Sequence, residues 1–203
     1  HEGKLDRAQA LSNAQREEIY ATISATPVTP VIGVEIEGVD LTVDVPNDQI
    51  EDLTRALANH NVLFFRDQPE LTPEQQIRFA RRFGELHLHP AAPKGAEHPE
   101  LFVIHTHGES FVNNGADWHT DVSCDEEPPL GTMLQIHRTP GFGGDTLFAN
   151  MYAAYDALSE KMKSLLDGKI AVHDSERAYR GRYSDKGVDD TGVTFPTAEH
   201  PVI

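Results

Sequence analysis

The sequence predicts an α+β domain with an antiparallel β core, and three features support this fold class. Apolar residues recur at spacings of three and four after Asn47, which is typical of an amphipathic helix. A capping sequence that begins at Thr72 marks a second helix. Short runs rich in β-branched and aromatic residues follow, separated by loops with proline and glycine. We therefore expect helices first and several short strands afterwards.

The first elements are expected between residues 31 and 66. Residues 31–41, VIGVEIEGVDL, mix β-branched residues with two glycines and predict a strand and a turn. From Asn47, the positions Ile50, Leu53 and Leu57 lie on one face of a helix. The run NVLFFR at 61–66 is short, apolar and rich in strand-forming residues, so it predicts a core strand.

The helix after Thr72 has the clearest local signals. Thr72 is the expected N-cap, Pro73 occupies the first helical position, and Gln75 stands where a capping box needs it. Ile77, Ala80 and Phe83 form the expected apolar face. Gly84 is the expected stop.

Strand-like runs dominate the chain after this helix. We expect strands at 101–105, 131–137 and 145–149. A helical stretch at 151–167 should be broken near Ser159, and Gly168 should end it.

The composition is that of one globular domain, 1–203, in which residues 1–30 form an N-terminal extension. The chain has 38% hydrophobic and 25% charged residues, with no repeat and no low-complexity tract. It lacks an apolar run of about 18 residues and a secretion signal at its start, so we expect a soluble, cytoplasmic protein. Cys124 is the single cysteine, which excludes an internal disulfide and a thiolate-rich zinc site.

The charge of the chain restricts its partners. A formal net charge of -16 opposes binding to nucleic acid or to an anionic membrane, because both need a basic face. Small molecules are the expected ligands, and a few pocket arginines can still hold an anionic one. We also expect a homo-oligomer.

The segment 117–121, DWHTD, carries the most informative chemistry. In a strand or at its edge, His119 and Asp121 would place an imidazole and a carboxylate on one face, two residues apart. Both could then reach one metal ion. Non-haem iron oxygenases bind iron through two histidines and one carboxylate and leave positions open for a co-substrate and for dioxygen. A His-x-Asp triplet alone is also common as a pair of solvated side chains.

The surrounding sequence resembles the taurine dioxygenase (TauD/TfdA) family of Fe(II)- and 2-oxoglutarate-dependent dioxygenases. The resemblance is carried in order by GVEIEGVDL, VLFFRDQ, LTPEQQIRFARRFGEL, HPAAP, WHTDVS and PGFGGDTLFANMYAAYDALS. It spans nearly the whole chain from about residue 31. The family implies a double-stranded β-helix, or jelly-roll, flanked by helices.

The resemblance also implies roles for individual residues. His119 and Asp121 match two of the three iron ligands, and Thr146 matches the threonine that hydrogen-bonds the 2-oxoglutarate carboxylate. Substrate contacts are expected at His89, Asn114 and Val122. The implied reaction uses Fe(II), molecular oxygen and 2-oxoglutarate to hydroxylate a small anionic substrate, such as a sulfonate, a sulfate ester or an aryloxy carboxylate, with release of succinate and CO2.

Part of the family pattern has no match before the chain stops at Ile203. The third iron ligand is a histidine well over a hundred residues after the first, followed by an arginine that binds 2-oxoglutarate. His137, His173 and His200 align with positions that are not ligands. We expect that the C-terminal strands of the family are missing from this sequence. The rival hypothesis is a non-catalytic jelly-roll binding protein that lacks a complete iron site.

Two other groups of residues have open interpretations. The pairs His87-x-His89 and His105-x-His107 resemble the start of a cupin metal site, but the glutamate spacing does not fit. A structural or loop role is therefore favoured for His105 and His107. The segment 177–183, RAYRGRY, is either a lid for an anionic substrate or a solvated loop.

The resemblance argues against taurine as the preferred substrate. Taurine-specific members place a tyrosine where this chain has Ala92, an asparagine where it has Gly115, and a Ser-Phe pair where it has Ala178 and Tyr179. Asn113 and Asn114 stand close to Gly115 in the sequence. These changes mostly remove polar contacts and bulk, so we expect a larger or more apolar anion.

Overall fold

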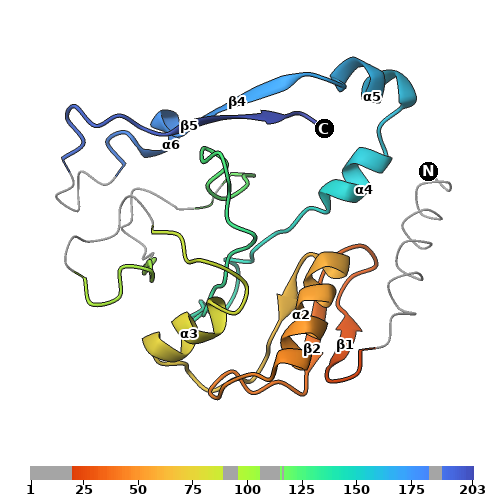
Figure 1. Ribbon diagram of the computed structural model, residues 1–203, viewed down its shortest axis with the longest axis vertical. Coiled ribbons are helices and arrows are strands. Elements are labelled where there is room, and N and C mark those ends of the chain that lie inside the picture. Colours follow the sequence, from red (N-terminus) through yellow and green to blue (C-terminus); the bar gives the residue numbers. More distant parts are fainter. Residues whose placement is uncertain (1–19, 89–95, 106–114, 116, 183–188) are drawn as a thin grey trace. The chain divides into compact units, whose positions relative to one another are not determined.

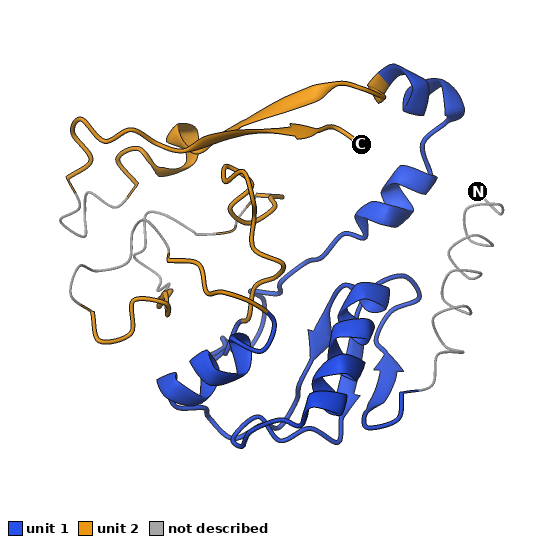
Figure 2. Cartoon of the chain, viewed as in Figure 1, with its two compact units in different colours: residues 1–83, 134–165 blue, residues 84–133, 166–203 orange. Residues whose placement is uncertain are grey.

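The computed structural model describes residues 20–88, 96–105, 115, 117–182 and 189–203 (Figure 1). The chain divides into two compact units, unit 1 with residues 1–83 and 134–165, and unit 2 with residues 84–133 and 166–203 (Figure 2). Helices and strands both occur, as the predicted α+β class requires, but the strands are not purely antiparallel, since one pair in unit 1 is parallel. Among the described residues, no helix is long and apolar enough to cross a membrane.

Unit 1 contains a three-stranded sheet in the order β1-β2-β3. β1 (Ser24–Pro27) pairs antiparallel with β2 (Val34–Glu37), and β2 pairs parallel with β3 (Leu63–Phe64). The strands predicted within 31–41 and 61–66 are therefore confirmed, although each is shorter than its apolar run. β1 has no strand signal of its own and lies inside the segment predicted as an N-terminal extension.

Helix α2 (Asn47–His60) forms where the sequence predicts it and contacts β3 of this sheet (Figure 1). Its side chains Ile50, Leu53 and Ala56 are buried, and Leu53 and Val34 are the largest fully buried side chains. Burial of one such leucine stabilises the fold by roughly 1.5–3 kcal/mol. The helix ends where Asn61 adopts a left-handed backbone, and its N–H donates to the carbonyl of Leu57.

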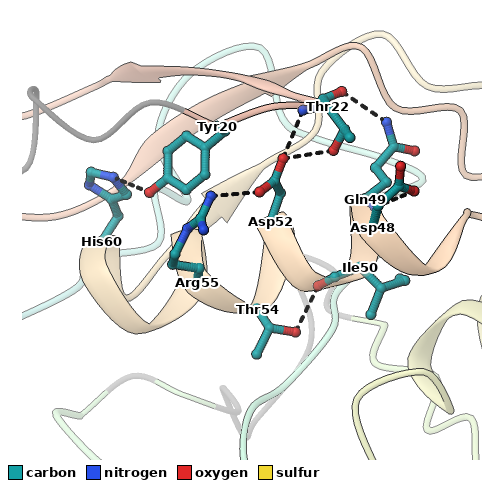
Figure 3. A network of polar contacts seen from close by, with 9 residues as sticks. All are labelled: Tyr20, Thr22, Asp48, Gln49, Ile50, Asp52, Thr54, Arg55 and His60. Atoms are coloured by element: carbon teal, nitrogen blue, oxygen red, sulfur yellow. Dashed lines mark hydrogen bonds and ion pairs between the residues drawn. The ribbon is translucent and has the colours of Figure 1, made fainter.

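A buried polar network joins α2 to the segment before β1 (Figure 3). Asp52 is 5% exposed, and its Oδ2 accepts hydrogen bonds from the backbone N–H and the hydroxyl of Thr22 at 2.7 and 2.8 Å. Arg55 donates to Asp52 Oδ1 at 2.6 Å. Burial alone would raise the pKa of Asp52, but the hydrogen bonds from Thr22 and the charge of Arg55 hold it below its ordinary value of 3.8.

We expect Asp52→Asn to lower the free energy of unfolding by about 2 kcal/mol at pH 7, because it removes a charged acceptor from Thr22. A carboxyl group whose pKa is lowered on folding stabilises the native state above its unfolded pKa. That contribution disappears as the pH falls from about 4 through the lower folded value. Urea unfolding between pH 2 and 7 measures the difference between the two proteins.

Asp48→Asn is the matched control, because Asp48 lies in the first turn of the same helix and is exposed. Its loss should be limited to about 0.5 kcal/mol of interaction with the helix dipole. A loss at Asp52 no larger than this, or one that persists unchanged at pH 2, would contradict the prediction.

Helix α3 (Pro73–Ala80) begins as its sequence predicts. The hydroxyl of Thr72 accepts from the backbone N–H of Gln75 at 3.3 Å, and the Gln75 side chain accepts from the N–H of Thr72 at 2.8 Å. The helix ends before the expected Gly84, and its buried residues are Ile77 and Phe79. Phe79 meets the rings of Phe65 and Phe83 edge-on, so aromatic contacts set the buried face.

The predicted break near Ser159 is also confirmed. α4 (Met151–Asp156) and α5 (Glu160–Leu166) are separate helices, and Gly168 follows with a φ of 68°. Asn150 caps α4, because its Oδ1 accepts from the N–H of Ala153 at 3.0 Å. The Asn150 amide also donates to the carbonyl of Val31 at 2.7 Å and ties the helix to the start of the sheet region.

The predicted strands at 101–105, 131–137 and 145–149 are wrong within the described residues, since none of these segments forms a strand. A strand needs a neighbour whose backbone groups complete its hydrogen bonds, and sequence preference does not supply one. In the segment 131–137 the side chain of Gln135 bonds the backbone of Leu71 instead, through both its oxygen and its nitrogen.

Unit 2 contains a two-stranded antiparallel sheet, and the sequence predicted neither of its strands. β4 (Ile170–Asp174) pairs with β5 (Thr197–Pro201), and α6 (Glu176–Tyr179) lies between them in the sequence. His173 stands opposite Ala198, and His200 stands opposite Ala171. The two histidines are therefore diagonal neighbours on the same face of the sheet.

Candidate metal centre

His119 and Asp121 meet in unit 2, although not in the way that the sequence suggested. The expected strand at this position is absent, because residues 118–120 have no regular structure and a turn begins at Asp121. The side chains nevertheless face each other, with His119 Nε2 at 3.3 Å from Asp121 Oδ1. Both side chains are about half exposed. Local backbone geometry, rather than the pleat of a strand, brings the two groups together.

The hydrogen bond of His119 Nδ1 shows which atoms of His119 and Asp121 could bind a cation. His119 Nδ1 lies 2.7 Å from the carbonyl oxygen of Asp117, and a carbonyl can only accept, so Nδ1 carries a proton. In the neutral ring, Nε2 then presents a lone pair toward a carboxylate oxygen. Two acceptors at this distance need a shared cation, either a proton or a metal ion.

Thr132 orients the carboxylate of the pair. Its hydroxyl donates to Asp121 Oδ2 at 2.7 Å and leaves Oδ1 facing His119. Two ligands at right angles, each about 2.1 Å from a divalent metal, lie about 3 Å apart, close to the observed separation. Nitrogen and oxygen donors of these types suit Fe(II). The two residues therefore fit neighbouring positions on one iron ion.

The backbone on both sides of the pair is unusual. Gly115 has a φ of 80°, and a Cβ added there would lie 3.6 Å from His119 Cε1. Val122, a predicted substrate contact, directly follows Asp121 and has a φ of 52°. A left-handed backbone is rare for a β-branched residue, so surrounding contacts must hold it.

Three histidine side chains form hydrogen bonds to Ser123–Asp125, the segment that follows Val122. His173 bonds the hydroxyl of Ser123, His200 bonds the carbonyls of Ser123 and Asp125, and His87 bonds the Asp125 carboxylate. Between them Cys124 is buried, and burial raises the pKa of its thiol above the ordinary value, with help from the charge of Asp125. Cys124 is therefore a packing residue rather than a nucleophile.

Thr146, the predicted 2-oxoglutarate contact, belongs to unit 1. It is exposed and follows Gly143 and Gly144, whose φ values of 73° and 76° turn the chain. Two residues later, Phe148 meets the ring of Phe64 edge-on, with centroids 6.3 Å apart. This packing fixes the segment that carries Thr146.

Two predicted substrate contacts, His89 and Asn114, lie outside the described residues. Most of the RAYRGRY segment is described, and Arg180 in it is already engaged. It pairs with Glu176 at 2.6 Å and its guanidinium lies over the ring of Phe195. These contacts favour a structural role for Arg180 over a free anion-binding one.

The later histidines have partners of their own. His137 lies 3.1 Å from Glu70 Oε1, and His173 and His200 bond the Ser123–Asp125 segment. In the described part of the chain, no three His, Cys, Asp or Glu side chains form a group that could hold a metal ion. That these three histidines are not metal ligands stays a prediction from the sequence.

Sequence reasoning missed two features of this region. Thr132 comes 11 residues after Asp121, and nothing in its local sequence marks it as a partner of the carboxylate. The roles of His173 and His200 depend on the pairing of β4 with β5. Neither feature has a signal in the local sequence, because both depend on contacts between residues that are distant in the chain.

Known proteins resemble the chain along most of its length. It is 34% identical over 187 residues to an alpha-ketoglutarate-dependent sulfate ester dioxygenase of Pseudomonas putida, which covers 87% of this chain and 60% of that protein. It is 33% identical over 168 residues to an alpha-ketoglutarate-dependent 2,4-dichlorophenoxyacetate dioxygenase of Cupriavidus pinatubonensis, with 75% and 58% covered. The chain thus spans less than two thirds of the length of each protein.

The fold agrees with these relationships. The crystal structure of a taurine dioxygenase from Burkholderia xenovorans matches with a TM-score of 0.65 and 30% identity, over 90% of this chain and 58% of that one. The family described as "Taurine catabolism dioxygenase TauD, TfdA family" matches residues 24–203. This match confirms the resemblance read from the sequence motifs. The chain belongs to the TauD/TfdA family.

Proposed function

We propose that the protein is an Fe(II)- and 2-oxoglutarate-dependent dioxygenase that hydroxylates a small anionic substrate. The observation that carries the proposal is the pair of acceptors, His119 Nε2 and Asp121 Oδ1, held 3.3 Å apart by hydrogen bonds on their opposite atoms. Family membership and the names of the relatives support it. The finer architecture, a jelly-roll core continued by further C-terminal strands, is part of the same proposal.

The proposed reaction balances without a general base. One 2-oxoglutarate, one dioxygen and one substrate C–H bond give succinate, CO2 and a C–OH group. One oxygen atom enters succinate and the other enters the product. Bound iron would supply the activation of oxygen, and the protein would supply ligands, orientation and exclusion of water.

Each assigned residue has a limited task in this proposal. His119 and Asp121 would bind the metal through Nε2 and Oδ1, and the Asp117 carbonyl and Thr132 would keep those atoms aimed at it. The Thr146 hydroxyl would donate to a carboxylate of 2-oxoglutarate. His89, Asn114 and Val122 would line the substrate pocket. Homo-oligomeric assembly and a cytoplasmic location stay predictions from the sequence.

The test of the function is the joint requirement for three reagents. With an alkyl sulfate or an aryloxy carboxylate as substrate, we expect succinate release only when Fe(II), oxygen and 2-oxoglutarate are all present. Oxygen and 2-oxoglutarate should disappear in equal amounts, because each turnover uses one of each. An oxygen electrode and quantification of succinate measure both. Binding of the anions by folded protein without any turnover would favour the non-catalytic jelly-roll.

A further inference from the structure

Val122 is the starting point, because its backbone stores strain beside a proposed metal ligand. Its φ of 52° lies in the left-handed region, which is strained for a β-branched residue. The residue before it is Asp121, whose carboxylate position depends on this turn. A relaxed turn would change the direction of the chain beside Asp121. Something must therefore hold the chain after Val122.

His200 holds the backbone of that segment from β5. Its Nε2 lies 3.0 Å from the carbonyl oxygens of both Ser123 and Asp125. Carbonyl oxygens accept only, so His200 donates one Nε2 proton between them. The bond spans three residues of the turn and fixes the direction of both carbonyls. The imidazole thus acts on the backbone rather than on a side chain.

His173 holds the same segment from β4. Its Nδ1 lies 2.8 Å from the hydroxyl of Ser123, and its ring meets that of His200 edge-on with centroids 5.1 Å apart. Both imidazoles lie on one face of the β4–β5 pair, as the register requires. The two strands therefore present a rigid pair of hydrogen-bonding groups to residues Ser123–Asp125.

We propose that His173 and His200 are positioning residues that keep Val122 left-handed and so aim the Asp121 carboxylate at the metal. This histidine clamp, His173 and His200 on Ser123–Asp125, rests on the proposed function, because Asp121 must be a ligand for the aim to matter. The clamp gives a role to two histidines that the sequence analysis did not count as metal ligands. Neither of them binds the metal.

The test measures Mn(II) affinity by the loss of the free-ion signal in electron paramagnetic resonance, with 2-oxoglutarate present, so that the readout does not depend on turnover. We expect His200→Leu and His173→Leu each to weaken Mn(II) binding about tenfold or more, in the range usual for residues that orient metal ligands. His200→Gln keeps an N–H donor and should retain most of the affinity. His137→Leu, at a histidine outside the clamp, should leave binding as in the wild type.

A double-mutant cycle separates the clamp from general damage. Glycine adopts a left-handed backbone freely, so Val122→Gly removes the need for the clamp. In that background His200→Leu should cost no more than about threefold. Val122→Ala keeps the strained Cβ, so there the full tenfold cost should remain. An equal cost of His200→Leu in the wild type and in the Val122→Gly and Val122→Ala backgrounds would overturn the inference.

Two further outcomes distinguish this inference from the proposed function. Mn(II) binding that survives His119→Ala and Asp121→Ala would refute the metal pair and the proposed function with it. Binding that needs Asp121 but is unchanged in both clamp variants would refute the clamp alone. Thermal unfolding shows whether each variant folds.

Ser123→Ala is the variant to use if His200→Leu fails to fold, because it removes only the bond to His173. It should still weaken Mn(II) binding about threefold. Wild-type affinity in Ser123→Ala would count against the clamp.

Discussion

Replacement of His119 or Asp121 by alanine is expected to abolish 2-oxoglutarate turnover. Each variant removes one of the two described donors of a proposed three-ligand site, and the ligands that remain cannot hold the metal in place. Loss of groups that only orient such ligands already costs about 10–100-fold, so loss of a ligand should exceed about a hundredfold. Succinate release at saturating Fe(II) measures the effect, and a metal titration shows whether binding is lost with it.

His137→Ala serves as the control for these variants. His137 is also a half-exposed histidine beside a carboxylate, but its partner is Glu70, and no metal role is assigned to it. It should retain wild-type turnover. Near-normal turnover in His119→Ala or Asp121→Ala would show that the pair is an ordinary surface ion pair. Unchanged thermal unfolding in all three variants is expected, because the side chains of His119 and Asp121 are exposed and add little to the core.

Alkyl sulfates, longer sulfonates or aryloxy carboxylates are expected to exceed taurine as substrates by about a hundredfold or more in kcat/KM. A pocket built to hydrogen-bond a small zwitterion rejects analogues that lack its polar groups by such factors, and a pocket that lacks the matching partners binds the zwitterion poorly in turn. Here Gly115 replaces an asparagine, and Ala178 and Tyr179 replace a Ser-Phe pair.

Succinate release across a panel of these anions, with taurine included, ranks the substrates. Gly115→Asn should raise activity toward taurine, because asparagine tolerates the left-handed φ of 80° and restores a polar group beside His119. Gly115→Ala adds a Cβ without the amide and is the matched control. Taurine as the best substrate of the wild type would refute the inference from the pocket, while the dioxygenase assignment would stand.

The sequence alone determined the elements whose stabilising contacts are local. The capping box of Thr72 and Gln75 closes within four residues, so the start of α3 could be predicted to the residue. The face of α2 follows from helical spacing, and the break near Ser159 follows from local composition. The family could also be identified from the chain, because its motifs occur in order and are specific together.

Only the tertiary structure decided which strand-like runs find a partner and how the metal pair is aimed. Residues 131–137 have strand composition but no partner in the described chain, whereas β1 has little strand signal and pairs with β2. His173 and His200 lie 50 and 77 residues from Ser123, and only the pairing of β4 with β5 brings them to it. Strand pairing and the orientation of a side chain depend on contacts with residues that are distant in the sequence. A local sequence pattern does not show which distant residue will make the contact.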